Sequence, residues 1–463
     1  MDDRDLPTDG DLVLTGFRSP LGDMLVCTDG WIEEVGCGLA VPTGHVVVDL
    51  GGADLLPGLV DAHSHVQQWA VHRIAADLSG ARSWDETLAL VRPDDGFFLG
   101  VDYDDGAWPD PPDPRGLDRF GFPVVLRRVC GHRALASEEA LDLIGRRYPW
   151  AVGDDGLTER GALALLDIVE IPMEARVGAV RAAVRDLLAV GITCVHEIAP
   201  DIDPLRRAGE PIRWVAYRTW DGAGPPPMDG FIGMKLFADG SIGSRTAWVS
   251  GGYADGSTGG AYMDREDLWS AISAAAARGI QVMVHAIGDE AVGMVADVLR
   301  EVAGSHELWR PRIEHMEMVH PSSWDVLREV GVVASMQPNF VARWGMPGGM
   351  YERALGDRYL RMNLFRTALD LHLAFGSDCM PPDPFLGIRG ATGHPDPSER
   401  LTVEEAVGAY TMGGAHAAGL EDEIGLIAPG RKCDVIAVRG GIPNGLEVAT
   451  VVDGRIVYRR DGG

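Results

Sequence analysis

Short apolar runs alternate with segments of helical periodicity through the central part of the chain. Helical patterns at 177–190, 265–278 and 290–302 separate runs that have the character of buried strands. This alternation is typical of parallel strands joined by crossover helices, so we expect an α/β protein built on a (β/α)8 TIM barrel. The eight expected strands centre on residues 59–60, 124–126, 192–195, 232–236, 281–284, 312–313, 332–335 and 371–375.

Both ends of the chain carry a different pattern, in which short β-type runs alternate with glycine-bearing turns. Such runs occur within residues 11–50 and again within 434–458, where Asp453-Gly454 is a hairpin signal. We therefore expect the two end segments to form one small β-sandwich. The expected domains are 1–54 and 421–463 for the two parts of the sandwich and 55–420 for the barrel, with an insertion around 80–120.

The chain is strongly acidic, with 69 Asp and Glu against 41 Lys and Arg and a formal net charge of −28. Because such a surface repels phosphate groups, we expect neither nucleic acid nor a membrane as a partner, but a small-molecule substrate. The first residues lack a basic leader with an apolar core, so we expect a cytoplasmic protein. Six scattered cysteines indicate neither a disulfide framework nor a thiolate metal site. The sequence leaves open whether two copies of the chain associate as a homodimer.

The most informative motif is Asp61-Ala62-His63-Ser64-His65, at the end of the first expected strand. On a strand, side chains two positions apart point to the same face. If this strand belongs to a barrel, His63 and His65 both reach the interior at its rim. Neutral imidazole is a common zinc ligand, so the pair can bind one metal ion.

Three further polar residues, His285, His315 and Asp378, each follow a later expected strand. The carboxyl ends of strands are where barrel enzymes place their active sites. His285 and His315 are 30 residues apart, about one strand-helix unit, and His315 and Asp378 are 63 apart, about two. A lone histidine at a strand end is more often a hydrogen-bonded structural group than a ligand. The conjunction of five such residues favours a metal site.

Lys235 lies within an expected strand, in the run Gly233-Met234-Lys235-Leu236-Phe237. An ammonium group that points into the barrel is costly to bury, which lowers its pKa; the alternative is a lysine on the outside of the barrel. A neutral amine can react with carbon dioxide to form a carbamate. Its two anionic oxygens could bridge two metal ions.

Four sequence blocks carry a family resemblance that covers nearly the whole chain: residues 56–65, 235–247, 376–378 and 425–435. The block Lys-x-Phe-x-Asp-Gly-Ser-x-Gly-Ser-Arg at 235–245 is the most specific of them. With these blocks the chain resembles the amidohydrolase superfamily, in the amidohydrolase 3 branch that includes N-substituted formamide deformylases. The resemblance implies two metal ions, with His63 and His65 on the more buried one, His285 and His315 on the second, carboxylated Lys235 as the bridge and Asp378 as ligand and proton acceptor.

The same resemblance implies three residues near the substrate, namely His132, Glu159 and Arg245. His132 would also be catalytic, by assisting at the developing oxyanion. The structural alternatives are a loop histidine, a solvated glutamate at a helix start and an arginine that orders its loop. One departure concerns the substrate: Cys130 stands where the family has aspartate in the Asp-Gly-His motif that ends at His132.

Together these features predict a metal-dependent hydrolase acting on carbon–nitrogen bonds other than peptide bonds. We expect it to cleave an amide or N-formyl bond with metal-activated water, and Asp378 to transfer the proton. The expected cofactor is Zn²⁺, as one ion or as two bridged by carboxylated Lys235. Alternatives are a cyclic imide or urea hydrolase and an amino-heterocycle deaminase. A non-catalytic binding barrel is disfavoured because all six metal-site positions are filled.

Overall fold

The computed structural model describes residues 11–92, 97–129, 131, 133–153, 156–158, 161–162, 165, 169, 171–220 and 227–460. The chain divides into two compact units. The first comprises Met1–His65, Val184–Ile202 and Gly209–Gly463, and the second Val66–Ala183 and Asp203–Ala208. Within the described part of the chain, every helix is too short or too polar to span a lipid bilayer.

The first unit is built on a nearly closed sheet of eight parallel strands in chain order, which confirms the (β/α)8 barrel. The backbone amide of Asp378 donates to the carbonyl of His63 over 2.8 Å and so connects the segment after the last strand to the first strand. The strands are β6 (Leu59–Ser64), β13 (Ile192–Ala199), β14 (Arg213–Thr219), β15 (Gly233–Phe237), β16 (Gln281–Ala286), β17 (Arg312–His315), β18 (Val333–Met336) and β19 (Ala374–Phe375).

The prediction for one of the eight strands was wrong. The run 124–126 belongs to β9 (Val124–Arg128), which lies in a separate four-stranded sheet of the second unit. The barrel instead contains β14, whose ends carry Arg213 and Arg218 and therefore lack the continuous apolar run of a buried strand. Arg213 is tolerated there because its guanidinium pairs with Asp434 and Asp453, each at 3.0 Å.

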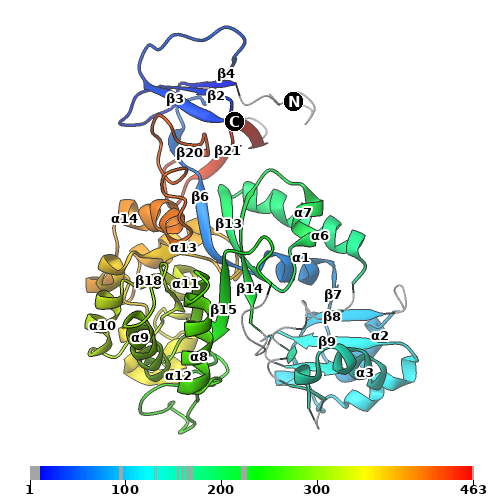
Figure 1. Ribbon diagram of the computed structural model, residues 1–463. Helices are drawn as coiled ribbons and strands as arrows, with labels where there is room; N and C mark the ends of the chain where they lie inside the picture. The colour runs from blue at the N-terminus through cyan, green and yellow to red at the C-terminus, as the bar shows by residue number, and fades with distance from the viewer. Residues whose placement is uncertain are drawn as a thin grey trace. The chain divides into compact units, whose positions relative to one another are not determined.

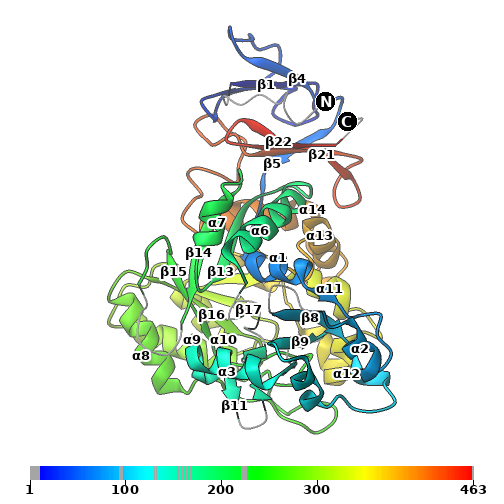
Figure 2. The same ribbon diagram turned by 90° about the vertical axis from the view of Figure 1, so that its right-hand side faces the viewer.

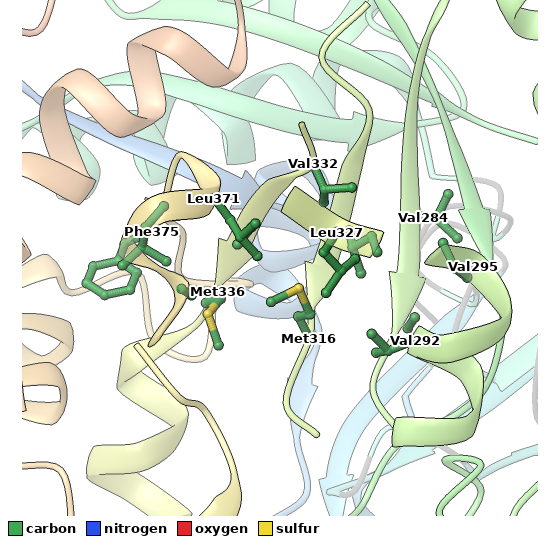
Figure 3. Close-up of a cluster of buried hydrophobic side chains, with 14 of the residues drawn as sticks. Val284, Val292, Val295, Met316, Leu327, Val332, Met336, Leu371 and Phe375 are labelled. Carbon is green, nitrogen blue, oxygen red and sulfur yellow. The ribbon is translucent and has the colours of Figure 1, made fainter. Parts of the chain in front are cut away.

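Helices cover the outside of the barrel, and α9 shows how the sequence produces this packing. Val292, Val295 and Leu299 follow helical spacing along one face of α9 and are fully buried. Figure 3 shows this outer core, in which Val292 and Val295 of α9 lie near Val284 of β16. The helices after β15 are α8 (Arg265–Ala276), α9 (Asp289–Ala303), α10 (Ser323–Val330), α11 (Pro338–Trp344), α12 (Met350–Leu355), α13 (Pro384–Thr392), α14 (Val403–Gly408) and α15 (Gly414–Ala417).

The end segments form the predicted β-sandwich, which belongs to the first unit. Its sheets have the strand orders β3-β2-β1-β4 and β22-β21-β20-β5, so one N-terminal strand joins the C-terminal sheet. Both sheets contribute to one buried cluster, and Figures 1 and 2 show the blue N-terminal and red C-terminal strands together. The strands are β1 (Leu12–Thr15), β2 (Met24–Thr28), β3 (Trp31–Gly36), β4 (Val46–Asp49), β5 (Asp54–Pro57), β20 (Val435–Arg439), β21 (Leu446–Val452) and β22 (Arg455–Arg459).

The second unit contains the segment between β6 and β13, within which the predicted insertion around 80–120 falls. Its four-stranded sheet has the order β10-β9-β8-β7 and has its own buried clusters. Its further strands and main helices are β7 (Ala76–Asp77), β8 (Phe98–Tyr103), β10 (Ala134–Ala136), α1 (Val66–Ile74), α2 (Trp84–Leu90), α3 (Glu138–Arg147) and α7 (Asp203–Ala208), and α6 (Met173–Leu188) connects it to the first unit.

Candidate metal centre

The structure brings the six predicted metal-site residues to the carboxyl half of the barrel strands, all within the first unit. His63, His65 and Asp378 form the tightest group, because each offers a ligand atom and these atoms lie within 4.8 Å of one another. Asp378 Oδ1 is 3.5 Å from His65 Nε2 and 3.8 Å from His63 Nε2. Two imidazoles and a carboxylate at this spacing suit a divalent metal ion.

His285 and His315 lie directly beside this group. Their ring centroids are 4.5 Å apart, and the ring of His315 is 4.7 Å from that of His63. Lys235 is fully buried on β15, and its Nζ lies 3.4 Å from His63 Nε2. The lysine therefore points into the barrel, and the alternative of an outward-facing side chain is wrong.

Left-handed backbone conformations at two strand ends help to form the cluster. The φ angles are 69° at His315 and 52° at Asp378. Residues other than glycine rarely adopt such positive φ angles, each of which costs about 1–3 kcal/mol. Neighbouring side chains on a regular strand point to opposite faces. The turn at His315 breaks this alternation, so both Glu314 and His315 reach His63.

The orientation of His63 is set by a buried carboxylate that sequence reasoning missed. His63 Nδ1 donates to Glu314 Oε2, which leaves Nε2 facing the cluster. Arg312 donates to both oxygens of Glu314, at 2.8 and 3.1 Å, and also to the carbonyl of Ala62 and to Ser335. The sequence did contain a signal for this ion pair: in Arg312-Ile313-Glu314, two charged residues of opposite sign flank an apolar residue within a short buried strand.

We expect Glu314→Gln to lower the affinity for a divalent metal ion by about 10–100-fold, because His63 loses the carboxylate that orients it. The free energy of unfolding should fall by about 3–5 kcal/mol, since the buried Arg312 guanidinium loses its counter-charge. Competition against a chromophoric chelator measures the first effect, and urea unfolding the second. The control is Ser335→Ala, which removes the hydrogen bonds of Ser335 with Arg312 and Glu314 but keeps both charges. Unchanged metal affinity in Glu314→Gln would contradict the orienting role.

Asp239 holds the backbone around His285. Its carboxylate accepts hydrogen bonds from the amides of Ile287, Gly288 and Trp248, at 2.8–3.0 Å. His285 Nε2 lies 3.0 Å from the carbonyl of Gly240, to which it can donate. With Nε2 donating to this carbonyl, a metal ion would be bound through Nδ1 of His285. These contacts give Asp239 a structural role in ordering the loop.

Burial sets the protonation of the cluster. It lowers the pKa of both His63 and His315 well below the ordinary value, helped by Lys235 at His63 and by His285 at His315, so these imidazoles are neutral. Burial lowers the pKa of Lys235 to about 8, against the opposing charge of Glu314. Burial also raises the pKa of Asp378 to about 7, while Lys235 acts in the opposite direction.

These side chains fit a metal ion. Neutral imidazole is the form that coordinates metals. The Nδ1 atom of His315 is buried and has no hydrogen-bond partner in the described part of the chain, which is costly unless a further group uses it. Four imidazoles and one carboxylate in this cluster are a donor set for a divalent transition metal rather than for calcium or magnesium.

Of the three predicted substrate residues, the structure describes Arg245 alone. His132 and Glu159 lie outside the described residues. Arg245 has a left-handed φ of 62°, and its half-exposed guanidinium pairs with Asp255. Its role in substrate binding stays a prediction.

A histidine and carboxylate cluster at the carboxyl end of a (β/α)8 barrel is the architecture of a metal-dependent enzyme. The chain belongs to the amidohydrolase family, whose model matches residues 46–458. This confirms both the predicted family and the prediction of a hydrolase that acts on carbon–nitrogen bonds.

Similar proteins include the putative amidohydrolase YtcJ of Bacillus subtilis, 27% identical, with 89% of this chain and 90% of the relative covered. The N-substituted formamide deformylase of Arthrobacter pascens is 23% identical, with 96% of each chain covered. Among solved structures, an uncharacterized metal-dependent hydrolase from Pyrococcus horikoshii has a TM-score of 0.78 at 24% identity, over 97% of this chain and 99% of the other. This structural likeness supports the fold.

Proposed function

We propose that the protein hydrolyses an amide or N-formyl bond of a small molecule with zinc as its cofactor. The observation that carries the proposal is the convergence of His63, His65, Lys235 and Asp378, together with His285 and His315, in one barrel interior. Such a site needs neither a serine nor a cysteine nucleophile. The similarity to an N-substituted formamide deformylase over 96% of the chain supports an N-formyl substrate.

The residues that would hold the metal divide into two groups. His63, His65 and Asp378 would hold one zinc ion, and His285 and His315 would hold a second. Lys235, with its Nζ 3.4 Å from His63 Nε2, lies between them in the proposal. Its amine would attack carbon dioxide and lose one proton, and the resulting carbamate would offer two anionic oxygens as metal ligands. Zinc bound there supplies Lewis acidity, which polarises a carbonyl and lowers the pKa of water.

The side chains of this chain carry the proton. Asp378 Oδ1 faces both His63 and His65 and accepts a proton from the attacking water. It then returns that proton to the nitrogen of the departing amine, which leaves as a neutral molecule. Glu314 keeps His63 in one orientation throughout, because its carboxylate accepts the hydrogen bond that Nδ1–H of that ring donates.

A substrate panel tests the proposal. Zinc-loaded protein is assayed with N-benzylformamide, N-acetylmethionine, succinimide and hydantoin, and the released amine or carboxylate is quantified. We expect hydrolysis of N-benzylformamide in preference to the others, abolished by a chelator and restored by zinc. A preference for succinimide or hydantoin would favour a cyclic imide or urea hydrolase. No hydrolysis of any panel member by protein that retains zinc would contradict the proposal.

A further inference from the structure

Gln337 is a buried residue at the mouth of the barrel that the mechanism above does not use. It directly follows β18, which lies in the barrel between β17, the strand that ends at His315, and β19, the strand that precedes Asp378. The amide of Gly376 donates to the carbonyl of Met336 over 3.0 Å, so the pairing with the neighbouring strand continues up to Gln337. Gln337 therefore lies at the level of the metal-site residues.

Alternation along β18 directs the Gln337 side chain toward the barrel interior. Ser335 accepts a hydrogen bond from the buried Arg312, and Val333 packs with Ala62 inside the barrel. Met336 belongs instead to the outer core that Figure 3 draws. Gln337 has φ −116° and ψ 87°, just outside the extended region, and it directly follows the extended residues of β18, so its side chain shares the side of Ser335.

Within the part of the chain that the structure describes, the carboxamide of Gln337 lacks hydrogen-bond partners. Gln337 is 1% exposed, and among the described residues neither its Oε1 nor its Nε2 has a partner. It precedes α11 without capping that helix. Burial of an unsatisfied carboxamide is unfavourable, and such groups in native proteins usually bind water or a ligand.

The backbone around Gln337 is held firmly. Asn339 donates to the carbonyls of Ser377 and Met380, at 2.8 and 2.9 Å, which ties the start of α11 to the segment that carries Asp378. A Cβ atom at Gly390 of α13 would lie only 2.0 Å from the carbonyl oxygen of Pro338, so α13 packs closely against this turn. A side chain on such a support is positioned for recognition before a ligand binds.

We propose that Gln337 is a specificity-determining residue that hydrogen-bonds an uncharged substrate group beside the scissile bond. A carboxamide offers N–H donors and a carbonyl acceptor without net charge. Its complement is a group that offers both an acceptor and an N–H donor, as in a secondary amide, a formamide, a urea or an imide. This inference rests on the proposed function and narrows its substrates to those that retain an N–H.

The test measures binding rather than turnover. The probes are N-benzylformamide and benzyl formate, which has an ester oxygen in place of the N–H. Dissociation constants are measured by ligand-observed NMR with zinc-loaded protein that carries Asp378→Asn to suppress hydrolysis. Gln337→Met, an apolar side chain of similar length, is added to this background. Met336→Leu on the outer side of the strand is the matched control.

We expect Gln337→Met to weaken N-benzylformamide binding at least about tenfold, equivalent to about 1.4 kcal/mol. Benzyl formate binding should change less, and zinc content and the melting temperature should not fall. The inference would be overturned if Gln337→Met and its parent bound N-benzylformamide equally, or if both probes lost affinity equally. It would also be overturned if the parent did not bind N-benzylformamide. A lower melting temperature with unchanged binding would show a structural role and also overturn it. The hydrolysis panel tests the proposed function separately, because binding of N-benzylformamide without its hydrolysis would contradict the proposed function but not the role of Gln337.

Discussion

Asp378→Asn is expected to lower kcat by about 10²–10⁴-fold, the contribution typical of a general acid–base group, while zinc stays bound. Asparagine keeps the size of the side chain and an oxygen that can face the metal. It also tolerates the left-handed backbone, with φ of 52°, that residue 378 adopts. The hydrogen bond from the backbone amide of residue 378 to the His63 carbonyl is unaffected by the change. What is lost is the ability to accept a proton.

Initial rates on the best panel substrate, combined with zinc analysis by atomic absorption, measure both parts of this expectation. Asp370→Asn is the matched control, because Asp370 is an exposed carboxylate paired with Arg328. That control should retain the wild-type rate. Near-normal turnover in Asp378→Asn would remove the proposed proton acceptor, and loss of zinc together with turnover would assign Asp378 chiefly to metal binding.

The barrel could be predicted from sequence because most of its strands are continuous apolar runs bounded by helical patterns. β14 was missed because Arg213 and Arg218 interrupt its apolar character, and the partners of Arg213, Asp434 and Asp453, lie far along the chain. β9 was wrongly included because an apolar strand of a small separate sheet has the same local pattern as a barrel strand. Local periodicity reports burial, but the choice of sheet depends on distant partners.

The candidate site was predictable to the extent that it depends on strand ends. The expected positions of His63, His285 and His315 follow from the rule that the carboxyl ends of parallel strands meet at one face. The left-handed backbone at His315 and the contact between Glu314 and His63 could not be anticipated, because both depend on three-dimensional packing. Gln337 was also missed, since nothing in a single glutamine indicates that it is buried without a partner.

Lys235→Ala is expected to reduce turnover by at least about 10³-fold and to lower the zinc content from two ions per chain toward one. The reason is that the proposed carbamate would join the two groups of histidines, and metal-based stabilisation is worth several kcal/mol in the transition state. A short carboxylate such as formate or propionate, added at high concentration, should restore part of the activity. Unchanged zinc content and activity would contradict the bridging role.

The composition of the chain makes the modification itself measurable, because Lys235 and Lys432 are its only two lysines. Lys432→Arg leaves Lys235 as the single lysine, and arginine can keep both the pairing with Asp453, now at 3.3 Å, and the contact with the Trp31 ring. After incubation with ¹³C-bicarbonate and zinc, we expect a carbamate carbon signal in the NMR spectrum of Lys432→Arg. That signal should be missing from Lys235→Ala, which retains Lys432 and the amino terminus. A carbamate signal of equal intensity in Lys235→Ala would place the modification on another amine. If Lys432→Arg retained two zinc ions but gave no signal, a group other than a carbamate would bridge the two ions.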